Sequence, residues 1–197
     1  MEKMRKIFVC FMGLCTSLFL VTSCGSSSSK YTPDAAGFAK MQDDLKSKFG
    51  DDAYYSGINI VYVSGNAPGS GITLSVNVTK DPASLSMEEW VYSSFGGWRQ
   101  TADVTLEAPE DVDVKEFMYQ LSGKFDLKKA GELVELSAKK LADEKQIKNA
   151  VLQTALLNPG GRPASSTEIY IDLQPENGGT TFSFRYDLDG NLISFDY

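Results

Sequence analysis

Histidine is absent from this sequence, and the three cysteines stand at positions 10, 15 and 24, all near the N-terminus. Hydrolases of the Ser-His-Asp and Cys-His classes are therefore excluded, as is a zinc site built from imidazole or thiolate ligands in the rest of the chain. Catalysis would have to rely on carboxylate pairs, tyrosine, lysine or a serine–lysine arrangement. Because no cysteine follows position 24, no disulfide can form beyond it, and the stability of the fold must come from its core.

Positive charge is also scarce. The chain has 19 Lys and Arg against 26 Asp and Glu, a formal net charge of −7 at pH 7. Nucleic-acid binding needs clustered basic side chains that neutralise phosphates, and an anionic lipid surface attracts the same kind of cluster. We therefore expect no nucleic acid among the partners and no attraction to anionic lipid.

One short acidic run, from Asp187 to Asn191, has the sequence Asp-Leu-Asp-Gly-Asn and resembles the start of a calcium-binding loop. A complete EF-hand loop needs a bidentate acid at its twelfth position, which would lie beyond Tyr197. An Asp-Gly pair is also typical of a β-hairpin turn, because glycine adopts positive φ without strain. We therefore predict a turn here, no metal site and no cofactor.

The first 24 residues have the layout of a secretory signal peptide. Three basic residues, Lys3, Arg5 and Lys6, precede an apolar run over 7–21. A retained membrane span needs about 20 apolar residues, and this run is shorter. The residues Val21-Thr22-Ser23-Cys24 resemble the lipobox of bacterial lipoproteins. The resemblance implies that 1–23 is a lipoprotein signal peptide, cleaved to leave Cys24 as a lipidated N-terminus.

Two other interpretations of this stretch stay open: a plain signal peptide with an incidental cysteine, or a buried core helix. Lipoproteins of this kind usually carry three acyl chains, palmitate among them, and stable anchoring takes more than one chain. Residue 25 is Gly rather than Asp, and serines rather than acidic residues follow it. By analogy with the sorting signals of Gram-negative bacteria, we expect the protein in the cell envelope, lipid-anchored to the outer membrane and facing the periplasm.

After the leader, the Ser-rich residues 24–31 predict a flexible tether, and a helix is expected over 33–49. Thr32 can supply a hydroxyl N-cap, Pro33 suits the first helical position, and Gly50 is typical of a helix end. Four apolar residues share one face at helical spacing and should pack into the core: Phe38, Met41, Leu45 and Phe49.

Strands are predicted next, from alternation of apolar and polar residues. The clearest alternation begins at Ile72 and continues through Val78. The segment 87–94 could also form a short helix, because Ser86 and Glu89 fit a capping box, but its aromatic residues and the Gly-Gly that follows favour a hairpin. The strands expected in this half are 58–64, 71–79, 87–94 and 98–107.

A connector over 109–125 begins with an acidic, proline-bearing stretch and leads to a second helix. Asp126 should cap this helix, which is expected to end between 142 and 148. The segment 150–157 could continue the helix or start a strand, and the sequence does not decide between them. If it is a strand, the second half has strands over 150–157, 167–173, 180–186 and 192–197.

The order of predicted elements repeats, which indicates an α+β fold made of two tandem α-β-β-β-β units, 32–108 and 126–197. Each unit would pack one helix on an antiparallel meander sheet. This pattern resembles the duplicated architecture of PepSY-type modules and of the secreted beta-lactamase inhibitor protein. The resemblance is one of topology alone, so it implies no functional residue.

Four large aromatic residues lie close together in the sequence: Trp90, Tyr92, Phe95 and Trp98. If they are exposed, they could stack on sugar rings or on an apolar partner, since Trp and Tyr are favoured at interfaces. The alternative is that they form the core of a hairpin. They are the best candidate binding residues that the sequence offers.

No catalytic residue is assigned. The adjacent acids Glu88 and Glu89, and likewise Asp51 and Asp52, should point to opposite faces of a strand and so make poor catalytic pairs. We therefore expect a non-enzymatic binding or protein-interaction module with an envelope protein or glycan as partner. The alternative is a small carboxylate-dependent envelope hydrolase, which would need a pocket holding two carboxylates about 5–9 Å apart.

Overall fold

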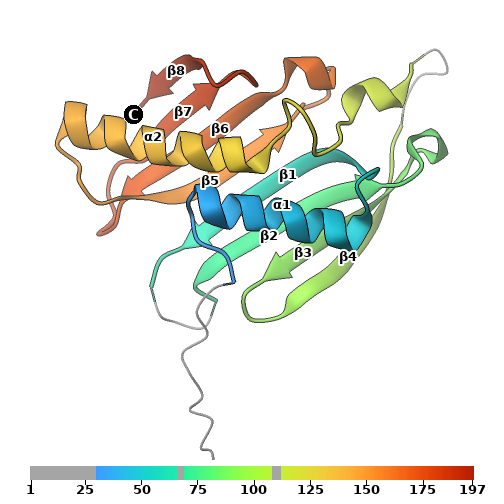
Figure 1. Ribbon diagram of the computed structural model, residues 1–197, viewed down its shortest axis with the longest axis horizontal. Helices are drawn as coiled ribbons and strands as arrows, with labels where there is room; N and C mark the ends of the chain where they lie inside the picture. Colours follow the sequence, from blue (N-terminus) through green and yellow to red (C-terminus); the bar gives the residue numbers. More distant parts are fainter. Residues whose placement is uncertain (1–29, 66–68, 108–111) are drawn as a thin grey trace, which may run out of the picture.

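The computed structural model describes residues 30–65, 69–107 and 112–197. These ranges contain two α-helices and an eight-stranded antiparallel sheet, so the fold is α+β as the sequence predicts. Both helices lie against one face of the sheet, and neither covers the other face (Figure 1). Cys24 and the rest of the lipobox lie outside the described residues. Within the described ranges, neither helix is long and apolar enough to cross a membrane.

The first half begins with α1 (Ala35–Phe49), whose N-cap is Asp34 rather than the predicted Thr32. The Asp34 carboxylate accepts a hydrogen bond from Gly37 N at 2.7 Å, and the Thr32 hydroxyl donates to that carboxylate instead of capping the helix. A carboxylate is favoured here because the first helical turn presents free N–H groups and positive potential. The strands that follow are β1 (Tyr54–Val63), β2 (Gly71–Thr79), β3 (Ser86–Ser93) and β4 (Gly97–Thr105).

The second half begins with α2 (Leu127–Lys145), and its N-cap is Asp126 as predicted. Gln146 caps the C-terminus of the helix, and its φ of 61° is left-handed. The segment that the sequence leaves open between helix and strand is a strand, β5 (Ala150–Asn158), and it pairs with β1. The other strands are β6 (Glu168–Pro175), β7 (Phe182–Tyr186) and β8 (Leu192–Asp196), and short 3-10 turns are η1 (Pro82–Ser84), η2 (Val114–Phe117) and η3 (Ala164–Ser166).

All strands belong to one sheet in the order β4-β3-β2-β1-β5-β6-β7-β8. The two halves meet where β1 and β5 pair antiparallel, with Ile58 opposite Leu157 and Ile60 opposite Ala155. The sequence predicts a sheet for each half but gives no sign of this junction. Its physical advantage is plain, because pairing the inner edge of each meander satisfies backbone groups that would otherwise be exposed.

The core fills the space between the helices and the sheet. Phe38 and Leu45, predicted as core, are fully buried, and Leu133 and Val134 of α2 are 5% and 4% exposed. From the sheet, fully buried side chains come from alternate positions of the central strands: Ile58, Ile60, Ile72, Leu74, Ala155, Leu157, Ile171 and Leu173. The intervening residues of the same strands therefore face the side that neither α1 nor α2 covers, which we call the helix-free face.

The helices run antiparallel and cap each other. Ala35 N at the start of α1 donates to the Glu135 carboxylate of α2 at 2.9 Å, and Leu127 N at the start of α2 donates to the Gln42 amide oxygen of α1 at 2.8 Å. Gly131 lets them approach, because a Cβ there would lie only 2.6 Å from Ala35 Cα. Each helix thus satisfies a free N–H group of the other.

Candidate binding site

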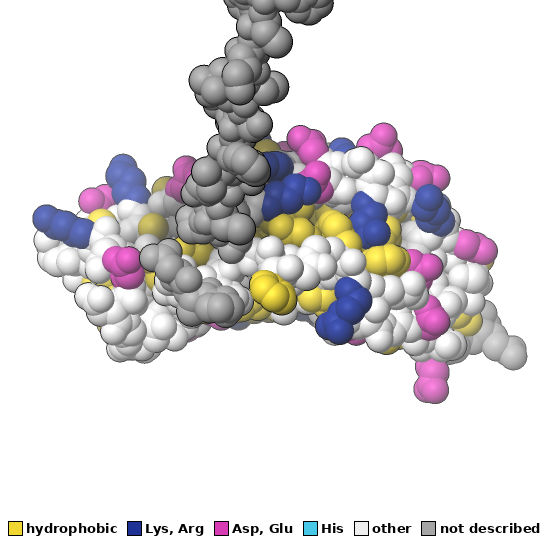
Figure 2. Space-filling view, turned by 90° about the horizontal axis from the view of Figure 1, so that it is seen from below, with side chains coloured by type: hydrophobic (Ala, Val, Ile, Leu, Met, Phe, Trp, Pro, Cys, Tyr) yellow, Lys and Arg dark blue, Asp and Glu magenta, His cyan; other side chains and the backbone are white. Residues whose placement is uncertain are grey.

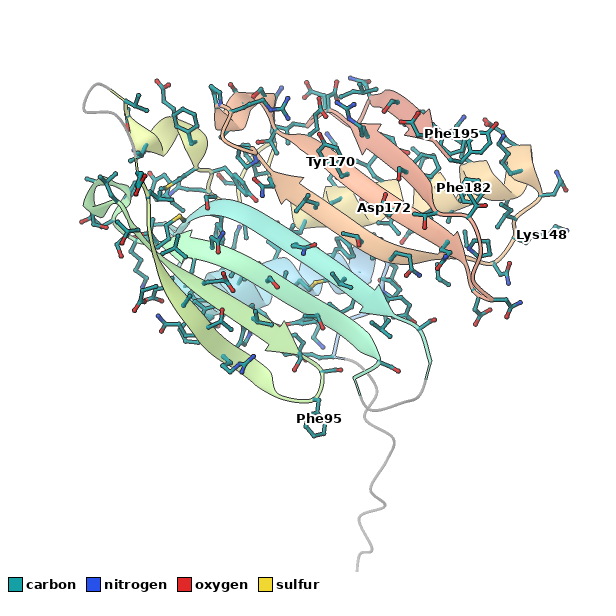
Figure 3. All side chains as sticks on the ribbon, turned by 180° about the vertical axis from the view of Figure 1, so that it is seen from behind. Phe95, Lys148, Tyr170, Asp172, Phe182 and Phe195 are labelled. Atoms are coloured by element: carbon teal, nitrogen blue, oxygen red, sulfur yellow. The ribbon has the colours of Figure 1, made fainter. Side chains whose placement is uncertain are left out.

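The structure brings together three of the four aromatic residues that the sequence singles out. Trp90, Tyr92 and Trp98 lie on the helix side of the β3–β4 hairpin, with the Tyr92 and Trp98 ring centroids 5.6 Å apart. Phe95 is 85% exposed in the turn between these strands, and Figure 3 shows it projecting from the end of the hairpin. Tyr92 is buried, while Trp90 and Trp98 are half-buried. The set is therefore part core and part surface.

Trp90 and Trp98 each pack edge-on against Phe49, the last residue of α1, with ring centroids 5.7 Å apart in both pairs. We call these three rings the Trp cluster. The ammonium group of Lys48 lies over it, 3.8 Å from the Trp90 ring centroid, and the Trp90 indole N–H donates to the Glu88 carboxylate at 2.7 Å. Figure 2 shows hydrophobic side chains gathered along one face of the molecule with basic side chains among them.

Tyr31, which the sequence assigns to the tether, belongs to the fold. Tyr31 is 1% exposed, its ring lies 4.9 Å from that of Tyr92, and its hydroxyl donates to Asp44 at 2.8 Å. Burial raises the pKa of Tyr31, and the neighbouring Asp44 carboxylate raises it further. Burial alone would raise the pKa of Asp44 as well, but the hydrogen bonds from Lys30 and Tyr31 hold it below its usual value. The fold therefore begins no later than Tyr31.

The helix-free face of the sheet holds a cavity of about 470 Å³ at the end where η2 lies. We call it the basin. Leu106, Val114, Phe117 and Met118 give it apolar walls, and its described lining contains one charged residue, Glu107. The amides of Asn77 and Asn158 also line it. These two asparagines come from neighbouring halves of the molecule, since Asn77 lies on β2 and Asn158 ends β5.

A groove of about 210 Å³ continues the basin toward the centre of the sheet and shares Asn77 and Asn158 with it. Asn59 of β1 lies in this groove, opposite Ser75 on one neighbouring strand and Leu156 on the other. Its amide oxygen is buried and has no hydrogen-bond partner among the described residues. Buried acceptors in folded proteins are normally satisfied, so this oxygen is an exception within the sheet.

In the second half, the helix-free face carries a charged cluster instead. Arg185 of β7 donates to the Glu168 carboxylate of β6 from Nε at 2.9 Å and from Nη2 at 2.6 Å. These hydrogen bonds hold the pKa of Glu168 below its usual value. Asp172, also on β6 and labelled in Figure 3, accepts a hydrogen bond from the Ser183 hydroxyl at 2.6 Å. The charged side chains on this part of the face therefore hydrogen-bond to one another or to neighbouring side chains of the sheet.

Two surface grooves each contain two carboxylates, which is the feature that a hydrolase would need. One groove of about 340 Å³ contains Asp81 and Glu88, but Asp81 accepts from Ala83 N as the cap of η1, and Glu88 holds the Trp90 indole. The other, of about 320 Å³, contains Asp143 and Glu144, which are adjacent on α2. In the first groove both carboxylates are engaged in structural hydrogen bonds, and in the second they occupy adjacent positions of one helix. Neither arrangement is that of a catalytic carboxylate pair.

The adjacent acids Glu88 and Glu89 diverge as predicted. The Glu88 carboxylate accepts from the Trp90 indole, whereas the Glu89 carboxylate accepts from the Thr101 hydroxyl at 2.6 Å. Asp51 and Asp52 are exposed in the turn before β1. Neither sequence pair forms a shared acidic site.

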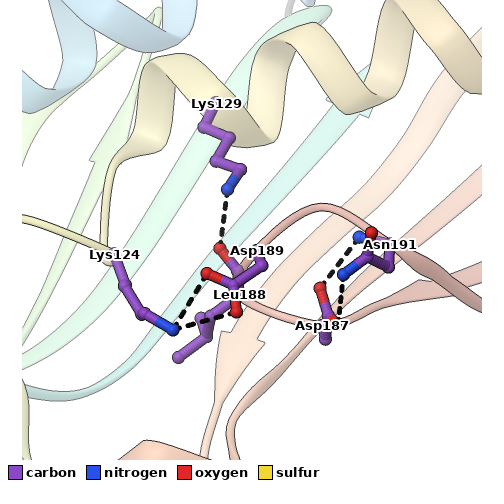
Figure 4. Close-up of polar contacts among 6 residues, drawn as sticks. All are labelled: Lys124, Lys129, Asp187, Leu188, Asp189 and Asn191. Atoms are coloured by element: carbon purple, nitrogen blue, oxygen red, sulfur yellow. Dashed lines mark hydrogen bonds and ion pairs between the residues drawn. The ribbon is translucent and has the colours of Figure 1, made fainter.

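The run from Asp187 to Asn191 forms the predicted turn, between β7 and β8. The Asp187 carboxylate accepts from the Asn191 backbone N–H at 2.8 Å and from its side-chain amide at 2.9 Å (Figure 4). Lys124 pairs with Asp189, and Lys129 donates to Leu188 O at 2.8 Å, which ties the turn to the start of α2. Across 30–65, 69–107 and 112–197, no group of three or more Asp or Glu side chains is placed to hold a metal ion.

Sequence reasoning missed the basin. The available signal was the polar half of the 71–79 alternation, which puts Asn77 on the face opposite the core. Comparison with family models, with curated proteins and with solved structures gives no match.

Proposed function

We propose that this chain is an envelope lipoprotein, anchored through Cys24 to the outer membrane and facing the periplasm, whose folded part is a non-enzymatic binding module. The support for the anchor is the order of basic residues, apolar run and lipobox in residues 1–24. Among the described residues, the first that is buried is Tyr31, which follows Cys24 closely in the sequence. A module attached in this way acts on partners within the envelope.

The basin carries the binding proposal. Its volume, about 470 Å³, falls within the range of roughly 300–1,000 Å³ that is usual for ligand sites. Apolar walls with a few convergent amides suit an apolar group flanked by hydrogen-bonding groups. The partner we propose is an envelope protein that inserts an apolar side chain into the basin and extends along the sheet over the groove that contains Asn59.

We further propose that the module consists of two tandem α-β-β-β-β units, as the resemblance to PepSY-type modules implies. Three features support this. Each helix has in its last turn a lysine whose ammonium lies over an aromatic ring from the hairpin at the outer edge of the same half. Lys48 of α1 lies 3.8 Å from the ring centroid of Trp90 in the β3–β4 hairpin, and Lys145 of α2 lies 3.9 Å from that of Tyr197, which follows β8. Both inner strands are irregular near their start, at Tyr55 in β1 and at Leu152 in β5. The helix caps are also reciprocal, because Ala35 N of α1 donates to Glu135 of α2 and Leu127 N of α2 donates to Gln42 of α1.

Site-directed photo-crosslinking tests the binding proposal. A photoreactive residue is placed at Asn77 or Asn158 in the full-length protein, with Lys40, exposed on α1, as the control position. After irradiation of intact cells, both basin positions should capture the same envelope protein and the control position should not. Capture of nothing at the basin, or the same products from Lys40, would count against the helix-free face as the binding surface.

A further inference from the structure

The Trp cluster is arranged as a partial cage around one cation. The Lys48 ammonium lies 3.8 Å from the Trp90 ring centroid, 5.2 Å from that of Phe49 and 5.8 Å from that of Trp98. Phe49 meets the two indoles at interplanar angles of 65° and 86°, so the rings form walls rather than a stack. All three distances fall within the range of about 6 Å at which ring faces attract cations.

Lys48 is a replaceable occupant of this cage. Its side chain is exposed, and no hydrogen bond or ion pair to another described residue holds its ammonium. An ammonium is compact and strongly hydrated, which weakens its attraction to an aromatic face. A quaternary ammonium has no N–H groups to keep solvated, and aromatic cages are the usual means by which proteins recognise such cations.

A groove with carboxylates adjoins the cage. The groove of about 340 Å³ that contains Asp81 and Glu88 is also lined by Phe49, so one ring belongs to both. Glu88 is fixed by the indole N–H of Trp90, a member of the cage. Lys80 lines the groove too, which leaves it two carboxylates and one ammonium. This space can accept the remainder of an organic cation whose charged head lies against the rings.

We propose that the Trp cluster is a binding site for a quaternary ammonium group, in which Lys48 of the protein itself holds the place of the ligand. The ligand displaces the Lys48 ammonium and places its cationic head against Phe49, Trp90 and Trp98, beside the Glu88 carboxylate. The site lies on the helix side of the sheet, so it is independent of the basin on the opposite face and does not rest on the function proposed above.

The chain contains two tryptophans, Trp90 and Trp98, so its indole fluorescence reports on this site alone. The full-length protein in detergent is titrated with tetramethylammonium chloride, with sodium chloride at equal ionic strength as the reference. Lys48→Met removes the resident charge and keeps the apolar stem. Lys46→Met, in the same last turn of α1 but without a ring contact, is the matched control.

Tetramethylammonium should change the fluorescence saturably, and sodium should not. Lys48→Met should tighten binding about two- to fivefold, the factor expected for removing one exposed cation–π contact. Lys46→Met should bind as the parent does, and Trp98→Phe in the Lys48→Met background should weaken binding. The proposal is overturned if Lys48→Met shows no saturable response, if its affinity equals that of the parent, or if sodium gives the same response.

Discussion

Replacing Gly131 with Ala tests the closest contact between the helices. Alanine is the better helix former, so the change alone would stabilise α2 by about 1 kcal/mol. The added Cβ, however, would lie 2.6 Å from Ala35 Cα, 2.8 Å from Asp34 O and 2.9 Å from Ala35 N. These are backbone atoms at the start of α1, so the methyl group cannot be accommodated by turning a side chain, and the helices must move apart.

The two effects have opposite signs, and the steric one should dominate. Overpacking of a core typically costs about 1–3 kcal/mol. Separation of the helices also weakens the hydrogen bond from Ala35 N to Glu135, which is worth about another 1 kcal/mol and offsets the gain in helix propensity. We expect a net loss of about 1–3 kcal/mol in the free energy of unfolding.

Urea unfolding followed by far-UV circular dichroism measures this loss as a lower midpoint at unchanged slope. Ala36→Gly, at an exposed position in the first turn of α1, gives a reference for the propensity effect without any steric component and should cost at most about 1 kcal/mol. A Gly131→Ala protein as stable as the parent, or more stable, would show that the helices are not in contact at Gly131.

Four further outcomes are expected. Cys24→Ser should move the protein from the membrane to the soluble fraction without changing its melting temperature, and continued membrane attachment would argue against lipidation. Leu45→Ala should cost about 2–5 kcal/mol in unfolding free energy, because this side chain is fully buried, whereas Lys46→Ser should cost under about 0.5 kcal/mol; equal effects would contradict the placement of α1. The pKa of Glu168 is held below its usual value in the fold, so its pairing with Arg185 stabilises the protein at any pH above that usual pKa, and this stability is lost as the pH falls through the lowered pKa. Glu168→Gln should therefore flatten the decline in melting temperature below about pH 4. An unchanged decline would refute the pairing. Thermal unfolding should give one transition by circular dichroism and tryptophan fluorescence alike, and two separated transitions would show that the halves unfold independently.

Local chemistry was enough to predict most elements. Strict alternation from Ile72 to Val78 predicts β2 with its correct bounds, and Asp126 marks the start of α2. Two local predictions are wrong, the N-cap of α1 and the start of β1, and each has a local physical reason. Thr32 gave way to Asp34 because the carboxylate is the stronger acceptor and the hydroxyl can donate to it. The start of β1 was missed because the register shifts between Tyr55 and Gly57, which breaks the alternation that predicts strands.

The junction of the halves and the basin required long-range information. Pairing of β1 with β5 depends on which strand edges meet, and edges carry no side-chain pattern of their own. The basin combines Asn77, Leu106, Phe117 and Asn158, which come from four segments of the chain. Periodicity could place Asn77 on the face opposite the core, but it could not bring the η2 segment to that face.

The single sheet makes each half depend on the other. Without the second half, β1 would present an unpaired edge where it now pairs with β5, and Ala35 N would lose the Glu135 carboxylate. Without the first half, β5 would be exposed and Leu127 N would lose Gln42. Both losses leave backbone groups without their protein partner, and an exposed strand edge is prone to pair with other chains. The basin has the same dependence, since its two asparagines lie on β2 and β5, so a half on its own would carry only part of the proposed binding surface.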